Sequence, residues 1–460
     1  MQHGDISEIG PLEVYCIIVG ISKEGEASQR SKLLTYLGIT LTFQFLGFVA
    51  TFVYSSYFNQ TTTFAESFVF RSSDELSGSL DFQSPQPFGN HFFGDYLWIY
   101  AEIKTNGLGG YFGASQLFMI VATKLPYYLS LILLFATSIL LFYVSTRLLL
   151  HELGLREQWA LLIGGVLFTQ PVLLATDRGQ IHLLLFALLL LGLTLFIKEG
   201  GNRMWGTILI AAAVSMKLAP VFFLLLFVRK RHWRELKIGL LSLAGFLILP
   251  LAYLHSGIGA LKYALGLSET RKFQNQMYNS VDYFANNLAH NNSFKLLSYH
   301  FSQMDSSLGK VGNFVYEHYF LFAGFLFLFF SWLIIQKSVT QFEAILLMAI
   351  ASSLLVPIAA GYNLMIFILP IVVVLTDKDF VFGRLNIIYC CYIGIVLMPK
   401  QIALDFDLYK SWSITLGGIL NPGLSICVTA FIACKHFSSS RRNRSVQTRS
   451  LNTENQLQVL

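Results

Sequence analysis

Residues 176–237 decide how the rest of the chain is interpreted. The segment begins TDRGQIHLLLFALLLLGLTLFIKEGG at 176–201, continues through MKLAP at 216–220 and closes with RKRHWR at 229–234. Apolar helices therefore alternate with charged groups that lie at their ends. Charged side chains are costly in hydrocarbon and mark functional sites when they occur there. The segment thus predicts polar chemistry at the mouth of membrane helices.

The composition of the whole chain is that of a membrane protein. Of its 460 residues, 54% are hydrophobic and only 13% are charged, whereas an ordinary soluble domain has about 25% charged residues. Apolar runs of about 17–25 residues, the length that a bilayer requires, recur along the chain. We therefore expect an all-α polytopic membrane protein. The formal net charge of +6 does not indicate nucleic-acid binding, because the basic residues sit at helix ends.

About ten full transmembrane helices are predicted, and lysine and arginine residues sort the connections between them. Basic residues crowd one set of connections, around Arg30, Arg147, Arg203 and the 229–237 cluster, and are sparse on the other. The crowded side is expected to be cytoplasmic, with both termini on it. The predicted spans are about 33–57, 125–148, 158–175, 181–197, 238–255, 313–335, 342–357, 362–376, 385–400 and 413–434.

One apolar segment, 205–228, does not fit this simple count. Basic residues on the same predicted side flank it, yet two full crossings need roughly forty residues. Pro220 also disfavours a continuous helix, because it lacks a backbone donor and clashes one turn back. We expect a broken hairpin of two half-helices with Lys217 near its tip, which is tolerated where it lines a cavity. The alternative is a single kinked helix whose Lys217 snorkels to the surface.

These assignments divide the chain into three parts. They are a cytoplasmic segment 1–32, a transmembrane domain 33–434, and a basic cytoplasmic tail 435–460 whose polar composition predicts disorder. Two long outer loops, 58–124 and 256–312, interrupt the transmembrane domain. Aromatic residues in the first loop suit headgroup depth and equally suit stacking on sugar rings. We expect neither a removable signal peptide nor a soluble catalytic domain.

The unusual polar residues converge on the side opposite the basic connections, which predicts a polar cavity that opens to the outer face. Asp95 lies among aromatic residues in GDYLWIY at 94–100. Desolvation can raise its pKa there and suit it to act as a general base, or it can be an ordinary helix cap. The converging residues are Asp95, Asp177, Arg178, Gln180, His182, Lys217, the 291–293 turn and Tyr362.

Each cationic residue of this set has more than one interpretation. Arg178 can pair locally with Asp177 or can clamp a phosphate with its planar guanidinium group. Lys217 can place a point charge on a phosphate at the hairpin tip. His182 can be a hydrogen-bonded core residue or can contact a ligand. No metal site is predicted, because the chain has no His-x-x-x-His, paired acidic or Cys–His pattern and its five cysteines lack zinc spacing.

The order of several short motifs resembles that of glycosyltransferase family 87, a group of polytopic membrane enzymes of the GT-C class. The resemblance covers about 90–376, most of the chain. Its pieces are, in chain order, Gly94-Asp95 with LGGY at 108–111, Gly179-Gln180, Lys217-x-x-Pro220, the basic run 229–233, Asn291-Asn292-Ser293 and PIAAGY at 357–362. The resemblance implies a GT-C-like helical bundle.

The chain departs from the family pattern at three positions. His182 stands where the family usually has asparagine, Tyr362 stands where it often has histidine, and Ala360 stands where it often has tryptophan. The substrate pocket is therefore altered. A preference for mannose cannot be transferred to this chain from the resemblance.

The resemblance implies an inverting glycosyltransferase of the integral membrane, placed in the plasma (inner) membrane with its active site on the outer face. One sugar, mannose-like or another hexose or pentose, would pass from a polyprenyl-phosphate donor to a lipid or glycan acceptor. Neither a cofactor nor a metal is implied. The implied site residues are Asp95 as the base, Arg178 and Lys217 as donor phosphate ligands, and Asp177, Gln180, His182, Asn291 and Tyr362 as pocket residues.

Two other functions compete with this one. A lipid-linked oligosaccharide ligase or polymerase is the nearest enzymatic alternative, because such enzymes also use arginine-rich outer loops. A membrane transporter is the alternative from another class, and its broken helices would bind substrate near the midplane. A transporter should distribute polar residues toward both faces, so the one-sided cluster disfavours it.

Overall fold

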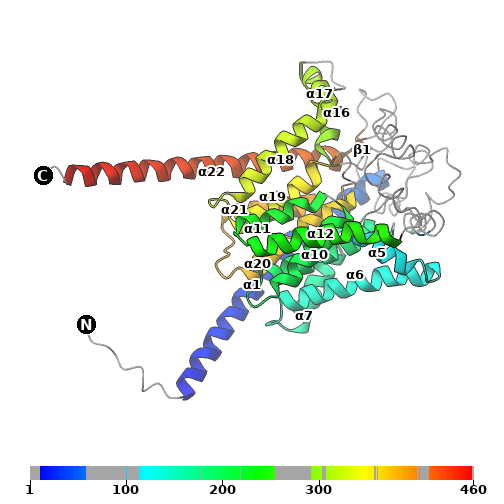
Figure 1. Cartoon of the computed structure of the whole chain (residues 1–460), viewed down its shortest axis with the longest axis horizontal. Helices are drawn as coiled ribbons and strands as arrows, with labels where there is room; N and C mark the ends of the chain where they lie inside the picture. The colour runs from blue at the N-terminus through cyan, green and yellow to red at the C-terminus, as the bar shows by residue number, and fades with distance from the viewer. Residues whose placement is uncertain are drawn as a thin grey trace.

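Helices make up nearly all of the regular structure in this computed structural model (Figure 1). The structure describes residues 11–57, 100, 113–177, 179–217, 219–253, 292–302, 307–356, 359, 361–400, 403–404 and 414–457, without the side chains of 11–27, 55–57, 177, 251–253, 403–404, 414–415 and 439–457. The two long outer loops therefore lie mostly outside the described residues. An antiparallel pair of two-residue strands, β1 and β2, is the one sheet in the described part.

The elements follow one another along the chain, and most of the helices are short. They are α1 (Pro11–Tyr57), α5 (Ala114–Ala122), α6 (Tyr127–Leu149), α7 (Leu155–Ala160), the π-helical turn η2 (Leu161–Leu167), α8 (Gln170–Asp177), α9 (His182–Ile197), α10 (Arg203–Met216), the 3-10 helix η3 (Ala219–Leu224), α11 (Leu225–Arg229), α12 (Trp233–Tyr253), α16 (Phe294–Ser302), α17 (Ser307–Glu317), α18 (Tyr319–Ile335), α19 (Gln341–Leu354), the 3-10 helix η5 (Gly361–Ile368), α20 (Ile371–Thr376), α21 (Arg384–Leu397), β1 (Ala403–Leu404), β2 (Ile414–Thr415) and α22 (Leu416–Leu457).

The all-α membrane character is confirmed, but about ten full transmembrane helices are not. Within the described residues, three helical stretches are long and apolar enough to cross a membrane, at 28–54, 127–149 and 416–438. Two bent pairs raise the number to 5: α7 and η2 with α8, and α17 with α18. Of the remaining predicted spans, 238–255 coincides with the 21-residue α12, which is not among these candidates, and the other four coincide with shorter apolar helices of 10–17 residues. The 16 residues of α9, for example, extend about 24 Å, whereas the hydrocarbon core is about 30 Å thick.

The C-terminal helix is longer than its predicted span. We expected a disordered tail from residue 435, yet α22 continues as a helix to Leu457. A helix satisfies its backbone hydrogen bonds within itself, so a polar segment can extend it without packing against the bundle. Figure 1 shows α22 projecting beyond the bundle, with its far end on the same side of the molecule as the start of α1.

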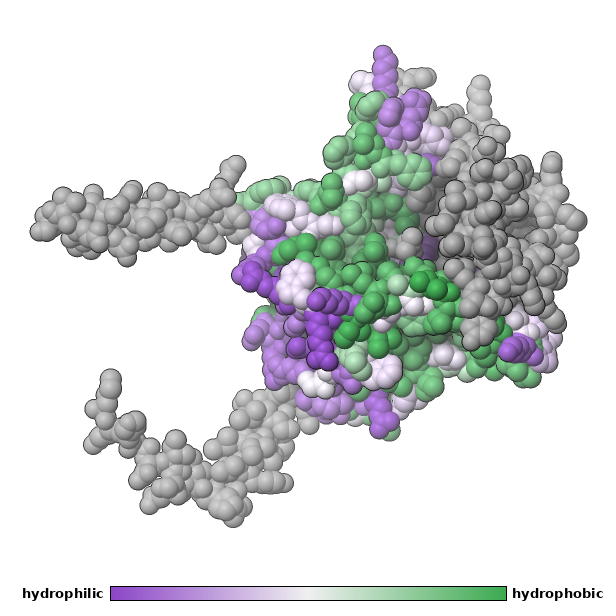
Figure 2. Space-filling model, in the orientation of Figure 1, coloured by the Kyte–Doolittle hydropathy of each residue, from purple (hydrophilic) through white to green (hydrophobic). Residues whose placement is uncertain are grey.

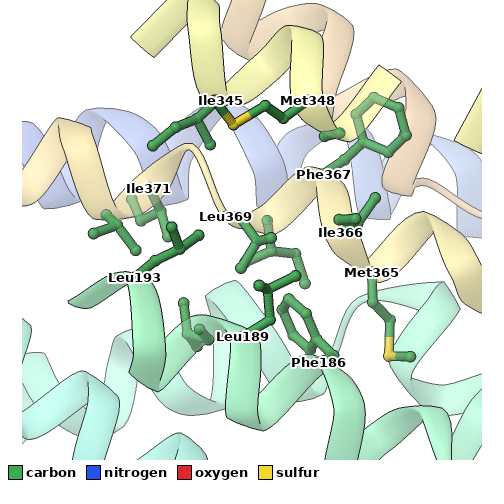
Figure 3. Packing of buried hydrophobic residues seen from close by; sticks show 14 of the residues in the cluster. Phe186, Leu189, Leu193, Ile345, Met348, Met365, Ile366, Phe367, Leu369 and Ile371 are labelled. Atoms are coloured by element: carbon green, nitrogen blue, oxygen red, sulfur yellow. The ribbon is translucent and has the colours of Figure 1, made fainter. Parts of the chain in front are cut away.

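Helix α9 lies at the centre of the bundle. Thirteen of its 16 residues are buried, as expected for a helix that is apolar on every side. It packs against α6, α10, α20 and η5. Figure 3 shows Phe186, Leu189 and Leu193 of α9 facing side chains of η5 and α20, with Ile345 and Met348 of α19 on the far side of that layer. His182, the first residue of α9, is thereby held at one end of a rigid element.

Two glycines let α10 cross α9 at close range. A Cβ atom on Gly206 would lie 2.7 Å from the carbonyl oxygen of Gly192, and one on Gly192 would lie 3.0 Å from the carbonyl oxygen of Gly206. Small residues allow membrane helices to approach until their backbones touch. The contact fixes α10 against the central helix, and the orientation of α10 determines where Lys217 lies.

The predicted broken hairpin is confirmed. Helix α10 ends at Met216, Lys217 adopts an extended backbone conformation, and the chain resumes as η3 at Ala219. The two ends of the hairpin farthest from its tip lie together, because Thr207 of α10 and Phe227 of α11 both approach Gly239 of α12. A single kinked helix would separate these ends by the full length of the segment. Lys217 therefore lies at the tip, away from the flanking basic residues.

The residues predicted to be cytoplasmic gather at one end of the bundle. Side chains there join segments far apart in sequence: Arg30 pairs with Glu157 at 3.0 Å, and Lys378 pairs with Glu199 at 2.9 Å. Lys32 donates to the backbone carbonyl of Asp377 at 2.8 Å. Figure 2 shows hydrophilic residues on this end beside a band of hydrophobic ones. The charge pattern thus grouped these connections correctly.

The turn between α11 and α12 contains an unusual backbone conformation. Arg231 has a φ angle of 55°, the one positive φ of a non-glycine residue in the described part of the chain. The amide of His232 donates to the carbonyl of Phe227 at 2.8 Å, and that of Arg231 donates to Val228 at 3.0 Å. This is the pattern of a Schellman helix ending, where glycine is favoured because a side chain costs free energy.

Replacing Arg231 with glycine should therefore stabilise the fold. A residue other than glycine costs roughly 1–2 kcal/mol in the left-handed region, and Arg231→Gly removes that cost while keeping both hydrogen bonds. We expect a higher midpoint of thermal unfolding in detergent for the variant than for the wild type. Arg234→Gly, on the exposed first turn of α12, is the control and should lower it, because glycine is unfavourable inside a helix. A lower midpoint for Arg231→Gly would contradict the assignment.

Candidate active site

Four of the eight residues predicted for the site can be located by their side chains, and these four lie together. Gln180, His182, Lys217 and Tyr362 meet where α9 begins, where the hairpin turns and where η5 begins. Asp95, Arg178 and Asn291 lie outside the described residues. Asp177 ends α8, but its side chain also lies outside the described part. The roles predicted for these four stay predictions.

Lys217 is the centre of the site. Its Nζ lies 3.2 Å from Nε2 of His182 and donates to Oδ1 of Asn363 at 3.0 Å. Both partners are neutral acceptors, and no carboxylate pairs with Lys217 in the part of the chain that the structure describes. An ammonium group has three N–H donors, and two of them are engaged here. The site therefore retains a positive charge and one donor that has no partner among the described residues.

The tautomer of His182 follows from its two neighbours. An ammonium group can only donate, so Nε2 of His182 accepts from Lys217 and the ring proton resides on Nδ1. Nδ1 then donates to Oε1 of Gln180 at 3.0 Å. His182 and Gln180 are both buried, with 5% and 4% of their surfaces exposed. Gln180 thus orients the ring that receives the lysine.

Tyr362 covers the other side of the imidazole ring. The two ring centroids lie 4.7 Å apart with an angle of 45° between the planes. Tyr362 and Asn363 belong to the 3-10 helix η5, which begins at Gly361. Neighbouring residues on this tight helix consequently contact both His182 and Lys217. The sequence pattern indicated Tyr362 but missed Asn363, although an amide within an apolar segment is itself an unusual feature.

A small cavity adjoins these polar groups. It lies between α9, the hairpin tip and η5. Four of its polar side chains lie together around Lys217, and the rest of the wall is apolar except for Ser352. The lining consists of His182, Leu185, Phe186, Leu189, Lys217, Ala219, Pro220, Ser352, Tyr362, Asn363, Met365 and Ile366. Such a cavity suits a ligand that carries an anionic group next to a less polar body.

The end of the second outer loop is anchored beside the site. The backbone amide of Asn292 donates to the carbonyl of Ala359 at 2.8 Å, and its side-chain amide donates to the same carbonyl at 3.1 Å. Asn421 of α22 donates to Oδ1 of Asn292 at 2.7 Å. The motifs at 291–293 and 357–362, which are 64 residues or more apart in sequence, therefore touch. Sequence reasoning identified the motif at 291–293 but named only Asn291 of it as a pocket residue.

The end of the first outer loop is anchored beside Lys217. The amide of Ala114, at the start of α5, donates to Oγ of Ser215 at 2.9 Å. Gly113 has a φ angle of 59°, and a Cβ atom on it would lie 2.4 Å from that oxygen. Glycine is required here for both reasons. The start of α5, which follows the first outer loop in sequence, therefore contacts Ser215, two residues before Lys217.

No group of three metal-ligating side chains occurs among the described residues. The chemistry of the located groups is that of an anion site: one ammonium group, two oriented partners and an aromatic ring. Such groups can stabilise negative charge on a bound ligand. They supply no proton acceptor suited to neutral pH apart from the imidazole, whose acceptor nitrogen is already engaged.

Comparison with known families agrees with this geometry. The model of glycosyltransferase family 87 matches residues 114–357, which is more than half of the chain. The matched segment runs from α5 to the end of α19 and contains Gln180, His182 and Lys217. Asp95 precedes it, and Tyr362 and Asn363 follow it. No curated protein and no solved structure matches the chain.

The tautomer of His182 is open to a direct test. Long-range ¹⁵N–¹H couplings in protein labelled with ¹⁵N-histidine distinguish a proton on Nδ1 from one on Nε2. We expect His182 to carry the proton on Nδ1, and Gln180→Leu to weaken that preference because the acceptor is removed. His151, which is exposed, serves as a control that should not respond to Gln180→Leu. A proton on Nε2 in the wild type would contradict the bond from Lys217.

Proposed function

Since the chain belongs to glycosyltransferase family 87, we propose that this membrane glycosyltransferase uses a polyprenyl-phosphate sugar as its donor. It transfers one sugar, a hexose or a pentose, to a lipid or glycan acceptor with inversion at the anomeric carbon. The reaction takes place on the outer face of the membrane, in the plasma (inner) membrane. The enzyme needs no metal and no cofactor.

The observation that carries the proposal is the charge of Lys217. Its ammonium group faces the cavity with neutral partners and one remaining donor. A polyprenyl phosphate that leaves the sugar gains negative charge in the transition state, so a fixed cation beside it lowers the barrier. A single phosphate with an apolar chain also matches the composition of the cavity, which is polar around Lys217 and mostly apolar elsewhere.

The remaining roles complete the reaction. The acceptor hydroxyl oxygen attacks the anomeric carbon while the bond from that carbon to the phosphate oxygen breaks. Asp95 receives the hydroxyl proton, and Arg178 shares the phosphate charge with Lys217. Asp177, Gln180, His182, Asn291 and Tyr362 shape the pocket. Arg178 is two residues from Gln180 in sequence, and the two loop ends that are anchored near Lys217 support a site assembled from both outer loops.

Two substitutions separate the base from the phosphate site. Asp95→Asn keeps the size of the side chain but removes its proton acceptor, so turnover should fall by roughly 10²–10⁴ with little change in donor KM. Lys217→Ala should lower kcat by about 10² and also raise donor KM, because the phosphate is charged before and after transfer. Lys310→Ala on α17 is the control. The measurement is transfer from a short-chain polyprenyl-phosphate sugar.

Three results would count against parts of this scheme. Wild-type transfer by Asp95→Asn would remove Asp95 from the mechanism. Activity that is lost in EDTA and restored by magnesium or manganese would remove the metal-free mechanism. Loss of kcat in Lys217→Ala without any change in donor KM would show that Lys217 does not bind the donor.

The membrane orientation can be tested independently. Single cysteines at positions 95, 178 and 217 should react with an impermeant reagent only from the outer side of sealed vesicles. Cysteines at position 231 and near either terminus should react only from the cytoplasmic side. The expectation rests on the basic residues gathered at the opposite end from Lys217. Labelling of position 178 from the cytoplasm would overturn the placement of the active site.

A further inference from the structure

The base of the hairpin, opposite Lys217, is a corner with exposed positive charge. Helix α10 begins there, and the turn between α11 and α12 lies next to it. Four basic residues of this corner are exposed and have no carboxylate partner among the described residues. They are Arg203, Lys230, Arg231 and Arg234.

Two of these cations, Arg203 and Lys230, are close enough to repel each other. Partial burial lowers the pKa of Lys230, and the neighbouring Arg203 and Arg229 lower it further, whereas Asp377 acts in the opposite direction. Arg229 itself is engaged, because it donates to the backbone carbonyls of Ile334 and Gln336, both at 2.6 Å. A bound anion would relieve the repulsion among the others. The other basic residues at this end, by contrast, include several that pair with Glu157 or Glu199.

The conformation of Arg231 provides independent evidence. It occupies the position of a Schellman turn where glycine has the lowest free energy. Strained residues of this kind cluster at functional sites. An arginine at a position that favours glycine therefore indicates that its positive charge has a function here.

The surroundings of the corner are those of a membrane interface. Trp205 and Trp233 flank the cations and are 54% and 55% exposed, and tryptophan favours the depth of lipid headgroups. Farther along α12, Leu240, Leu241, Ile248 and Leu249 form an exposed apolar face, with Leu241 74% exposed. A ligand at the cations can thus continue along α12 with an apolar chain.

We propose that this corner binds an anionic phospholipid of the leaflet at this end of the molecule. The phosphate of the headgroup lies among Arg203, Lys230 and Arg231, and the acyl chains follow the exposed face of α12. A soluble anion would use the cations alone, whereas a phospholipid uses both the charge and the apolar face. The inference goes beyond the proposed transfer reaction and does not depend on it.

Binding at this corner would affect the hairpin as a unit. Arg203 begins the first half of the hairpin and Lys230 follows the second half, so one phosphate contacts both. The lipid would hold the two ends together from outside the bundle. This supports the position of Lys217 at the tip, which the same two half-helices determine.

The test compares two double variants by native mass spectrometry in detergent. Lys230→Gln with Arg231→Gly removes two charges from the corner. Lys337→Gln with Arg384→Gln removes two exposed charges elsewhere and leaves the corner intact. Each basic residue near a membrane surface contributes about fivefold to binding of anionic lipid. We expect the corner variant to bind phosphatidylglycerol roughly 25-fold more weakly than the wild type, and the control to retain wild-type binding.

Three outcomes would overturn the proposal. They are equal phosphatidylglycerol binding by the corner variant and the wild type, an equal loss in both variants, and equal binding of phosphatidylcholine and phosphatidylglycerol by the wild type. Glycerol phosphate, which carries the phosphate without acyl chains, tests whether the apolar face takes part. If it displaces phosphatidylglycerol at a concentration similar to that of the lipid, the apolar face has no role in binding. The single variant Arg231→Gly retains the turn, so weaker lipid binding with unreduced thermal stability excludes misfolding as the cause.

Discussion

The ammonium group of Lys217 lies among apolar helices and therefore needs hydrogen-bond acceptors from the protein. This need constrains the fold around Lys217. Water is scarce at membrane depth, so an unpaired ammonium group there would cost several kcal/mol. His182 of α9 and Asn363 of η5 supply the acceptors. Three segments far apart in sequence are therefore tied together at one point. The chain interrupts regular helix at Lys217 and again just before η5, where these groups have to meet.

The cations at the two ends of the bundle have different kinds of partner. At the basic end, several cations are engaged with carboxylates or with carbonyls near the ends of neighbouring helices, as Arg229 is with Ile334 and Gln336, whereas the corner formed by Arg203, Lys230, Arg231 and Arg234 has no carboxylate partner among the described residues. At the end with the cavity, Lys217 has only neutral partners. Charges that are compensated internally stabilise an arrangement of helices. A charge that is not compensated is available to a ligand, as Lys217 is at the cavity and the corner cations are at the opposite end.

Two of the departures from the family pattern, His182 and Tyr362, are related in the structure. Compared with that pattern, the imidazole moves to position 182, where asparagine is usual, while an amide occurs at Asn363, next to the position where histidine is common. His182 and Tyr362 lie in ring contact. Because the two altered positions face each other, a change at one alters the space and the hydrogen bonds available to the other. In this chain, one imidazole and one amide contact the lysine.

Sequence alone determined the membrane class, the grouping of the basic connections and the break at Lys217. These depend on composition, on charge and on the backbone limits of Pro220, all of which are local properties. The number of full spans could not be read in this way, because an apolar run such as 342–357 has the composition of a span whether it crosses lipid or is buried within protein as α19. Asn363 and the contact between Asn292 and Ala359 were missed for a related reason. Their roles come from partners 67–146 residues away, and only the packing of α9, the hairpin and η5 brings those partners within hydrogen-bond distance.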